Sequence, residues 1–172
     1  MKRRIIRKWF WVWEFDKEEK WLNEMANRGW VLDSVGFAKY TFVESELGEY
    51  TVRLEMLENS PASSEGQDYI DFVEETGAEY IGNYMRWVYF RKKAADGQFD
   101  LFSDSDSRVK HMDRITKMAG GFALINLCIG ANNLRLSGFG LINIACAALL
   151  GYACMKLNRK KEALQKERSM HE

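Results

Sequence analysis

Histidine and cysteine are scarce in this chain of 172 residues. The two histidines, His111 and His171, lie far apart, so neither joins a cluster with the ligand spacing that zinc requires. The cysteines occur in the apolar C-terminal third, without the paired spacing of a zinc knuckle or a redox motif. They are predicted to act as small apolar side chains: Cys128, Cys146 and Cys154. We therefore predict no metal site and no cofactor.

The sequence also lacks the motifs that mark common active sites. Gly120-Gly121 is not followed by Lys-Ser/Thr, so it does not form a phosphate-binding loop. Adjacent acidic residues such as Glu18 and Glu19 are expected on a solvated helix face, and nothing in the pattern pairs them with a nucleophile or a base. We predict that the protein is not an enzyme, and we assign no catalytic residue.

An excess of positive charge is missing as well. The formal net charge is zero, but residues 1–100 carry 14 Lys/Arg against 19 Asp/Glu, a net charge of −5, whereas residues 156–172 are net +3. Proteins that bind nucleic acid neutralise phosphates with lysine and arginine. The acidic balance of the larger segment therefore argues against DNA and RNA as partners.

Hydrophobic patterns in residues 1–93 predict four strands and two helices. The strands are expected at 5–15, 31–43, 49–57 and 84–91, where β-branched and aromatic residues recur. The helices are expected after Asp16 and from Ser64, because each start has a capping residue and Gly29 or Gly77 follows the apolar face. The order β-α-β-β-α-β predicts an α+β fold of the ferredoxin-like sandwich type for a cytoplasmic domain, residues 1–93.

Two apolar segments dominate the rest of the chain. Met118–Leu134 and Leu136–Met155 contain no acidic residue, and each approaches the roughly 17–25 residues that cross a bilayer. We divide this part into a linker with a juxtamembrane helix, a transmembrane helical hairpin and a basic cytoplasmic tail: 94–117, 118–155 and 156–172. The alternative is a buried soluble hairpin, which the short first segment and its asparagines favour.

The distribution of basic residues predicts the orientation of this hairpin. Lysines and arginines flank it on both sides, and Arg135 is the only charge between the two apolar segments. Basic loops stay in the cytoplasm, so a multi-pass protein of the cell membrane with both termini cytoplasmic is expected. Within the hairpin, Asn126 and Asn143 fall at nearly the same depth and are predicted to face each other, while Ala147 and Gly151 allow close backbone approach. The alternatives are that Asn126 meets water or that both amides contact another membrane subunit.

The aromatic N-terminal segment raises the question of which residues face the core. Trp9, Trp11 and Trp13 alternate, and the period of 2 in the other strands assigns them to the core rather than to a platform for stacking bases or sugars. The opposite sheet face would then carry an apolar centre with basic residues at its rim, typical of a protein contact site: Phe10, Val12, Val88 and Phe90, with Arg53 and Arg86. The alternative is a face covered by the tail, the third helix or the hairpin.

Three short strings carry a resemblance to a known family. They are Glu18–Ala26 with Gly29 after it, Tyr40–Phe42 leading to Gly48–Tyr50, and Trp87–Phe90. The chain resembles the bacterial family catalogued as domain of unknown function 2812, over roughly residues 8–115 and in the hairpin that follows. Ala78 is a departure from this resemblance, because an aromatic residue is expected at that position in the family. The resemblance implies no catalytic or binding residue; it implies a companion of PadR-type repressors, with a role in envelope or stress-linked regulation.

These features together lead us to expect a membrane-tethered cytoplasmic interaction or sensory module with a regulatory role. Its partners would be the lipid bilayer and an unknown protein, and homo-oligomerisation stays open. The alternative from another class is an accessory subunit of a transport or envelope membrane complex. An unrecognised enzyme ranks last, because no acid–base or nucleophile constellation is visible.

Overall fold

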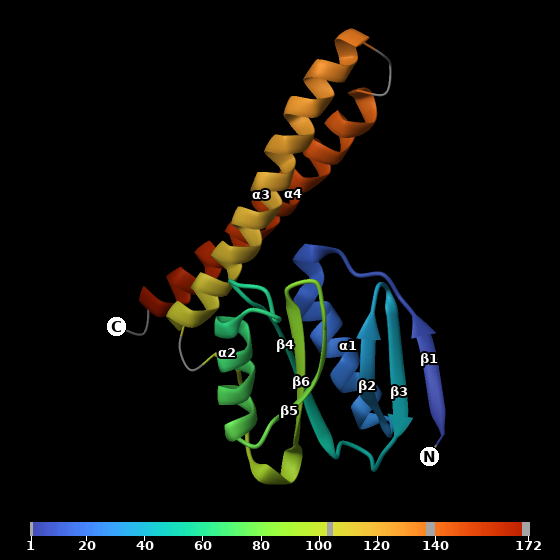
Figure 1. Ribbon diagram of the computed structural model, residues 1–172. Helices are drawn as coiled ribbons and strands as arrows, with labels where there is room; N and C mark the ends of the chain where they lie inside the picture. Colours follow the sequence, from blue (N-terminus) through green and yellow to red (C-terminus); the bar gives the residue numbers. More distant parts are fainter. Residues whose placement is uncertain (1, 103–104, 137–139, 170–172) are drawn as a thin grey trace. The chain divides into compact units, whose positions relative to one another are not determined.

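The computed structural model describes residues 2–102, 105–136 and 140–169 and divides into two compact units, Met1–Ser103 and Asp104–Glu172. Unit 1, the first of these, combines helices and strands, and unit 2 consists of two long helices (Figure 1). The predicted α+β class is therefore confirmed.

Unit 1 contains six strands and two α-helices in its described residues. Their order and bounds are β1 (Arg3–Arg7), α1 (Phe15–Asn27), β2 (Trp30–Gly36), β3 (Lys39–Glu44), β4 (Tyr50–Met56), α2 (Ser64–Glu75), β5 (Glu79–Tyr84) and β6 (Trp87–Lys93). Short 3-10 turns precede α1 at Val12–Glu14 and follow β6 at Ala94–Asp96. The strands form two antiparallel three-stranded sheets, with the orders β1-β3-β2 and β4-β6-β5. Figure 1 shows the first sheet on one side of unit 1 and α2 on the other.

The two sheets belong to two copies of one β-α-β-β arrangement. β1-α1-β2-β3 and β4-α2-β5-β6 have the same order of elements, and in each the first strand pairs with the last. Gly29 and Gly77, 48 residues apart, end the two helices with φ angles of +80° and +85°. The strand after each glycine has a bulge at the equivalent place, after Leu32 in β2 and after Tyr80 in β5. Unit 1 is therefore an internal duplication of its fold.

Apolar residues of the two helices cover opposite faces of the second sheet. Leu22 and Met25 of α1 pack with residues of both sheets, among them Phe42 of β3 and Leu54 of β4. Ile70 and Val73 of α2 pack instead with a second cluster: Leu57, Ala78, Val88, Phe90 and Phe99. The sheet β4-β6-β5 is thus buried on both faces, which explains why β6 begins with four apolar residues, Trp87–Phe90, rather than an alternating pattern.

The predicted β-α-β-β-α-β order is wrong, because two strands were not recognised. The run 31–43 is a hairpin, in which β2 and β3 are separated by a turn at Phe37-Ala38, and Ala38 has a positive φ. The strand β5 precedes a second turn at Met85-Arg86, so the predicted strand 84–91 straddles that turn. The ends of both helices at Gly29 and Gly77 agree with the prediction.

Unit 2 consists of α3 (Ser105–Leu136) and α4 (Gly140–Ser169), which pack against each other. Near one end of the pair, the Lys161 ammonium lies 2.8 Å from the Asp113 carboxylate. Among the described residues, α4 is the one helix that is long and apolar enough to cross a membrane, over Gly140–Lys166. By length and composition alone, this supports an association with a membrane. The corresponding expectation for the first apolar segment finds no such support.

Candidate functional site

A buried carboxylate lies where α1 meets strands from both sheets. Glu18 is on the same face of α1 as Leu22 and Met25, because these positions recur at helical spacing, so its side chain is directed into the core. The hydroxyl of Tyr40 from β3 donates a hydrogen bond to Glu18 Oε1 at 2.8 Å, and that of Tyr89 from β6 donates to the same atom at 2.7 Å. One carboxylate thus connects the two halves of unit 1.

Burial controls the protonation of this cluster. Loss of solvation raises the pKa of Glu18 above its ordinary value, while the hydrogen bonds from Tyr89 and Tyr40 act in the opposite direction. The pKa values of both tyrosines are also raised, first by burial and then by the negative charge of Glu18. Both phenols therefore stay protonated and keep donating to Glu18. A polar cluster with its hydrogen bonds satisfied fixes one arrangement of the two sheets.

The neighbouring residues of α1 cover the edge of β4. Asn23 accepts a hydrogen bond from the Val52 N–H and donates one to the Val52 carbonyl oxygen, both at 2.9 Å, as a neighbouring strand would. The Glu19 carboxylate accepts a hydrogen bond from the Leu54 N–H at 3.2 Å and lies 3.3 Å from Arg53 Nη1. Unprotected edge groups invite pairing with other chains. In this protein, side chains of α1 satisfy them.

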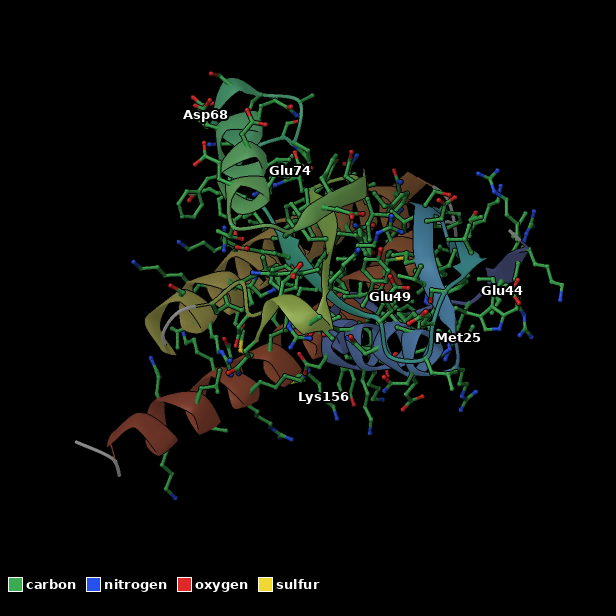
Figure 2. The ribbon with its side chains drawn as sticks, turned by 90° about the horizontal axis from the view of Figure 1, so that it is seen from below. Met25, Glu44, Glu49, Asp68, Glu74 and Lys156 are labelled. Atoms are coloured by element: carbon green, nitrogen blue, oxygen red, sulfur yellow. The ribbon has the colours of Figure 1, made fainter. Side chains whose placement is uncertain are left out.

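A hollow of about 380 Å³ lies where the two sheets approach each other. Its lining comes from β2, from the end of β3, from the connection between β3 and β4, from the start of β4 and from β6: Val31, Val43, Glu44, Ser45, Glu46, Glu49, Tyr50 and Arg91. Figure 2 labels Glu44 and Glu49 on the side of Met25 in α1, away from Asp68 and Glu74 of α2. The hollow is the candidate binding site of unit 1.

Arg91 forms one wall of this hollow and bridges the two sheets. Its Nε donates to the Glu79 carboxylate on the adjacent strand at 2.7 Å, and its Nη1 donates to the Leu32 carbonyl oxygen of β2 at 3.0 Å. The guanidinium carbon lies 5.0 Å from the centre of the Tyr50 ring. The charge of Arg91 is paired with Glu79, and Glu44 lies 3.9 Å from the exposed Lys2 ammonium, so glutamates, chiefly Glu46 and Glu49, dominate the remaining charge of the hollow. The lining therefore suits a ligand group that is positively charged or donates hydrogen bonds.

Among the residues that the structure describes, no group of three or more histidine, cysteine or acidic side chains has the arrangement of a metal site. The carboxylates of the hollow come from the last residue of β3 and from the connection that follows it, and the described lining brings no cysteine or histidine to them. The chemistry available there is ion pairing, hydrogen bonding and contact with an aromatic ring.

The predicted contact face on the outer side of the sheet is not exposed. Val88 and Phe90 are 0% exposed and pack under α2, whereas Phe10 packs with Trp21 and Tyr40 on the α1 side. Val12 lies in the 3-10 turn before α1. The prediction that these residues share one surface is wrong, because α2 covers the face that was expected to be open.

The two arginines predicted at the rim of that face have structural contacts. Arg53 lies against Glu19. Arg86 donates through Nε and Nη2 to the Leu57 carbonyl oxygen, at 2.9 and 2.6 Å, and also donates to the carbonyl of Glu58. It thereby ties the turn between β5 and β6 to the end of β4. The structure does not bring Arg53 and Arg86 together with Phe10 and Val12.

The core assignment of the N-terminal tryptophans is also corrected. Only Arg3–Arg7 forms a strand, and the chain leaves the sheet after Lys8. Beyond this point the alternation of a strand no longer decides which side chains face inward. Trp9 and Trp11 are exposed, and Trp13, which is partly exposed, stacks on Trp11 with ring centres 5.1 Å apart.

In unit 2, Asn126 was predicted to face Asn143, but the hydrogen bond that its side chain makes is to its own helix. Asn126 Nδ2 donates to the Phe122 carbonyl oxygen of its own helix at 2.9 Å. Asn143 is partly buried on α4, and Ala147 is buried, as expected for a residue between the helices. Close backbone approach is seen at two other residues, because a Cβ built on Gly140 would lie 2.5 Å from the Gly130 carbonyl oxygen. Gly151 has no such neighbour.

The prediction that Glu18 lies on a solvated helix face is wrong, because its side chain is buried, and Arg91 was not predicted as a site residue. Glu18 follows the helical spacing of Leu22 and Met25, so placing all three on one helical wheel would have identified a buried acid. Arg91 gave no comparable signal, because its contacts depend on the approach of β2 to β6.

The comparison with protein families agrees with the motifs in α1 and the strands. Residues 14–124 match the model of a family described as "Protein of unknown function (DUF2812)". The chain belongs to this family. The DUF2812 match covers α1 with Glu18, Glu19 and Asn23, the whole hollow and part of α3, and it begins after Trp9 and Trp11. The searches of curated proteins and of solved structures returned no match.

Proposed function

We propose that this protein is a membrane-tethered cytoplasmic interaction or sensory module, regulatory rather than catalytic. Unit 2 is the tether: α3 and α4 cross the cell membrane as a hairpin with both termini in the cytoplasm. Unit 1 is the part that recognises a protein partner or a small effector. The observation that carries this proposal is the outward surface of the α3–α4 pair.

That surface is apolar where a soluble hairpin would be polar. Large hydrophobic side chains are exposed along both helices: Phe122, Leu124, Ile125, Leu127, Ile129 and Leu134 of α3, and Leu141, Ile142, Leu149, Tyr152 and Met155 of α4. Small residues lie between the helices, including Ala119, Gly130, Gly140 and Ala147. Apolar residues outside and small residues inside are typical of helix pairs in lipid. This supports a bilayer around both helices, including the less apolar α3.

The distribution of basic residues supports the proposed orientation of the hairpin in the membrane. Basic residues before and after the apolar part of the pair, among them Lys110, Lys117, Lys156 and Arg159, are on the side of both termini. Positively charged flanks remain cytoplasmic. Arg135, whose side chain is outside the described part of the structure, is the one basic residue at the opposite end of the hairpin.

Recognition by unit 1 is assigned to the hollow at the junction of its sheets. The glutamates of this hollow and the ring of Tyr50 suit a lysine or arginine side chain of a partner protein, or an amine on a small effector. Arg91 and Glu18 each connect elements of both halves. A ligand that changes the spacing of the sheets would therefore change the hydrogen bonds of both residues. This arrangement is suited to sensing.

The second candidate function is an accessory subunit of a transport or envelope membrane complex. It is favoured by α3, which is not apolar enough to span a membrane by itself and carries Asn126, Asn132 and Asn133. Such a helix is stabilised in lipid by a neighbouring membrane protein. Purification of a stoichiometric membrane complex in mild detergent would favour this function over the first.

The proposed topology predicts a specific labelling pattern. In a chain whose three native cysteines are replaced by alanine, a cysteine at position 137 should react with a membrane-impermeant thiol reagent from outside intact cells. A cysteine at position 107 should react only after the cells are opened. Ser137 lies outside the described residues and is chosen from the sequence. Labelling of position 107 in intact cells, or release of the chain from membranes by alkaline carbonate, would contradict the proposal.

A further inference from the structure

Residues in and beside three loops at one end of unit 1 form a group of exposed and partly exposed apolar side chains, most of them aromatic. Trp9, in the connection after β1, is 54% exposed; Phe37, in the β2–β3 turn, is 64% exposed; and Met85, in the β5–β6 turn, is 62% exposed. The ring centre of Trp9 lies 5.4 Å from that of Phe37, which in turn lies 5.8 Å from Tyr84. We call this group the aromatic rim: Trp9, Trp11, Trp13, Phe37, Tyr84 and Met85.

Basic residues border the aromatic rim. Arg7 of β1 and Lys39 of β3 are directly opposite each other in the antiparallel register, and Lys8 follows Arg7 in the chain. Among the residues that the structure describes, none of these three cations takes part in an ion pair. Like charges in directly opposed strand positions destabilise a sheet. An anionic partner would offset this repulsion.

We propose that the aromatic rim and its basic border dock onto the headgroup region of an anionic phospholipid bilayer. This inference rests on the proposed membrane tether, which would keep unit 1 close to the bilayer surface and so raise its effective concentration there. Tryptophan is enriched at membrane interfaces because its ring is apolar and its N–H is polar. Lysine and arginine near the surface are attracted to anionic lipids.

A lipid surface accounts for features that another occupant would not need. The exposed side chains come from three separate loops and contact one another through their rings, so they can enter a soft interface as one apolar patch. The charge border is entirely basic on the β1–β3 side, although residues 1–100 as a whole are acidic. A second copy of the chain would present the same cations and would repel them.

Tryptophan fluorescence of the full chain tests this docking directly. All six tryptophans lie in unit 1, at or before Trp87, and α3 and α4 contain none. The full chain is reconstituted into vesicles of phosphatidylcholine and phosphatidylglycerol, with or without bromine atoms on the acyl chains just below the headgroups. Bromine quenches only nearby indoles. We expect a loss of up to about half of the emission, because three of the six tryptophans belong to the rim.

Variants separate docking from nonspecific proximity. Phe37→Asn combined with Met85→Asn removes apolar contact without removing a fluorophore, and it should reduce the quenching at least about twofold. Phe72→Asn combined with Leu47→Asn removes equally exposed side chains elsewhere in unit 1 and should leave the quenching unchanged. Arg7→Gln combined with Lys39→Gln should reduce the quenching in vesicles that contain phosphatidylglycerol.

The outcomes distinguish this inference from the proposed tether. A chain that does not float with the vesicles in a density gradient contradicts the tether itself. A chain that floats but shows equal emission with brominated and ordinary lipids overturns the docking inference alone. Equal quenching in pure phosphatidylcholine and in anionic vesicles overturns the assignment to anionic lipid. A rim that stays unquenched but shifts its emission to shorter wavelength as protein density in the vesicles increases binds another copy, which also overturns the inference.

Discussion

Phe90→Ala is expected to lower the free energy of unfolding of unit 1 by about 3–5 kcal/mol, the range for removing a fully buried large aromatic side chain. Phe90 is 0% exposed and packs with Ile70 and Val73 under α2. The substitution leaves a cavity between the sheet and the helix that neighbouring side chains fill only in part. Denaturant titration of the full chain in nanodiscs measures the effect through tryptophan emission, which reports on unit 1 alone because all the tryptophans are there.

Trp11→Ala is the matched control for this prediction. Trp11 is exposed and contacts Trp9 and Trp13, so its removal should cost less than about 1 kcal/mol. The side chain is as large as that of Phe90 or larger, and only its surroundings differ. Equal losses for both variants, or a larger loss for Trp11→Ala, would mean that the tryptophans face the core after all and that α2 does not cover β6.

Glu18→Ala is expected to destabilise unit 1 by about 2–6 kcal/mol, because it leaves two buried tyrosine hydroxyls without their acceptor, at about 1–3 kcal/mol each. Tyr40 and Tyr89 both donate to Glu18, and the two come from different sheets. The same denaturant titration measures the loss. The triple variant that adds both Tyr40→Phe and Tyr89→Phe should recover much of the loss, since no hydroxyl is then left unsatisfied.

Glu18→Gln is the control, and it gives the pH dependence. Its amide oxygen can still accept from the tyrosines, but it has no charge to bury. Burial raises the pKa of Glu18 above its ordinary value of 4.5, so the unfolded chain releases the proton at a lower pH than the folded chain does. As pH rises from about 4.5 through the raised folded-state pKa, wild type should therefore lose stability relative to Glu18→Gln. A constant difference across that range would contradict a buried, desolvated carboxylate.

The helix ends were predictable because local chemistry determines them. Gly29 and Gly77 adopt positive φ angles that other residues avoid, and each follows the last apolar residue of a helical face. Ser63 rather than Ser64 accepts the capping bond from the Gly66 N–H, a difference of one residue. Short-range signals of this kind need no knowledge of the tertiary fold.

The strands were harder to predict because their signals depend on distant partners. The turns at Phe37-Ala38 and Met85-Arg86 contain no glycine, and Ala38 and Met85 adopt positive φ angles without it. Neither pair of turn residues is therefore typical of a hairpin, and without the hairpins the duplication of the β-α-β-β arrangement could not be recognised. Burial of β6 on both faces likewise depends on the position of α2. The sequence of the strand alone does not indicate that position.

In the candidate site, too, the residues within one local string were predictable and the contacts between distant segments were not. Glu18, Glu19 and Asn23 belong to the string that carries the family resemblance, and the structure gives each a partner: tyrosines for Glu18, the edge of β4 for the other two. The hollow was not predictable, because its lining is drawn from segments that meet only when both halves are folded.

The most direct test of the membrane tether compares the surroundings of side chains on the apolar surface of the α3–α4 pair with those of a side chain near its basic end. Spin labels are attached to cysteines at Leu127 and Leu149, on the outward apolar surface, and at Lys110, in a cysteine-free chain reconstituted into bilayers. If the pair spans the membrane, dissolved oxygen relaxes the labels at 127 and 149 and a water-soluble nickel chelate does not, whereas the chelate relaxes the label at 110. Strong relaxation of all three labels by the chelate would show that the pair lies in water, and would contradict the tether.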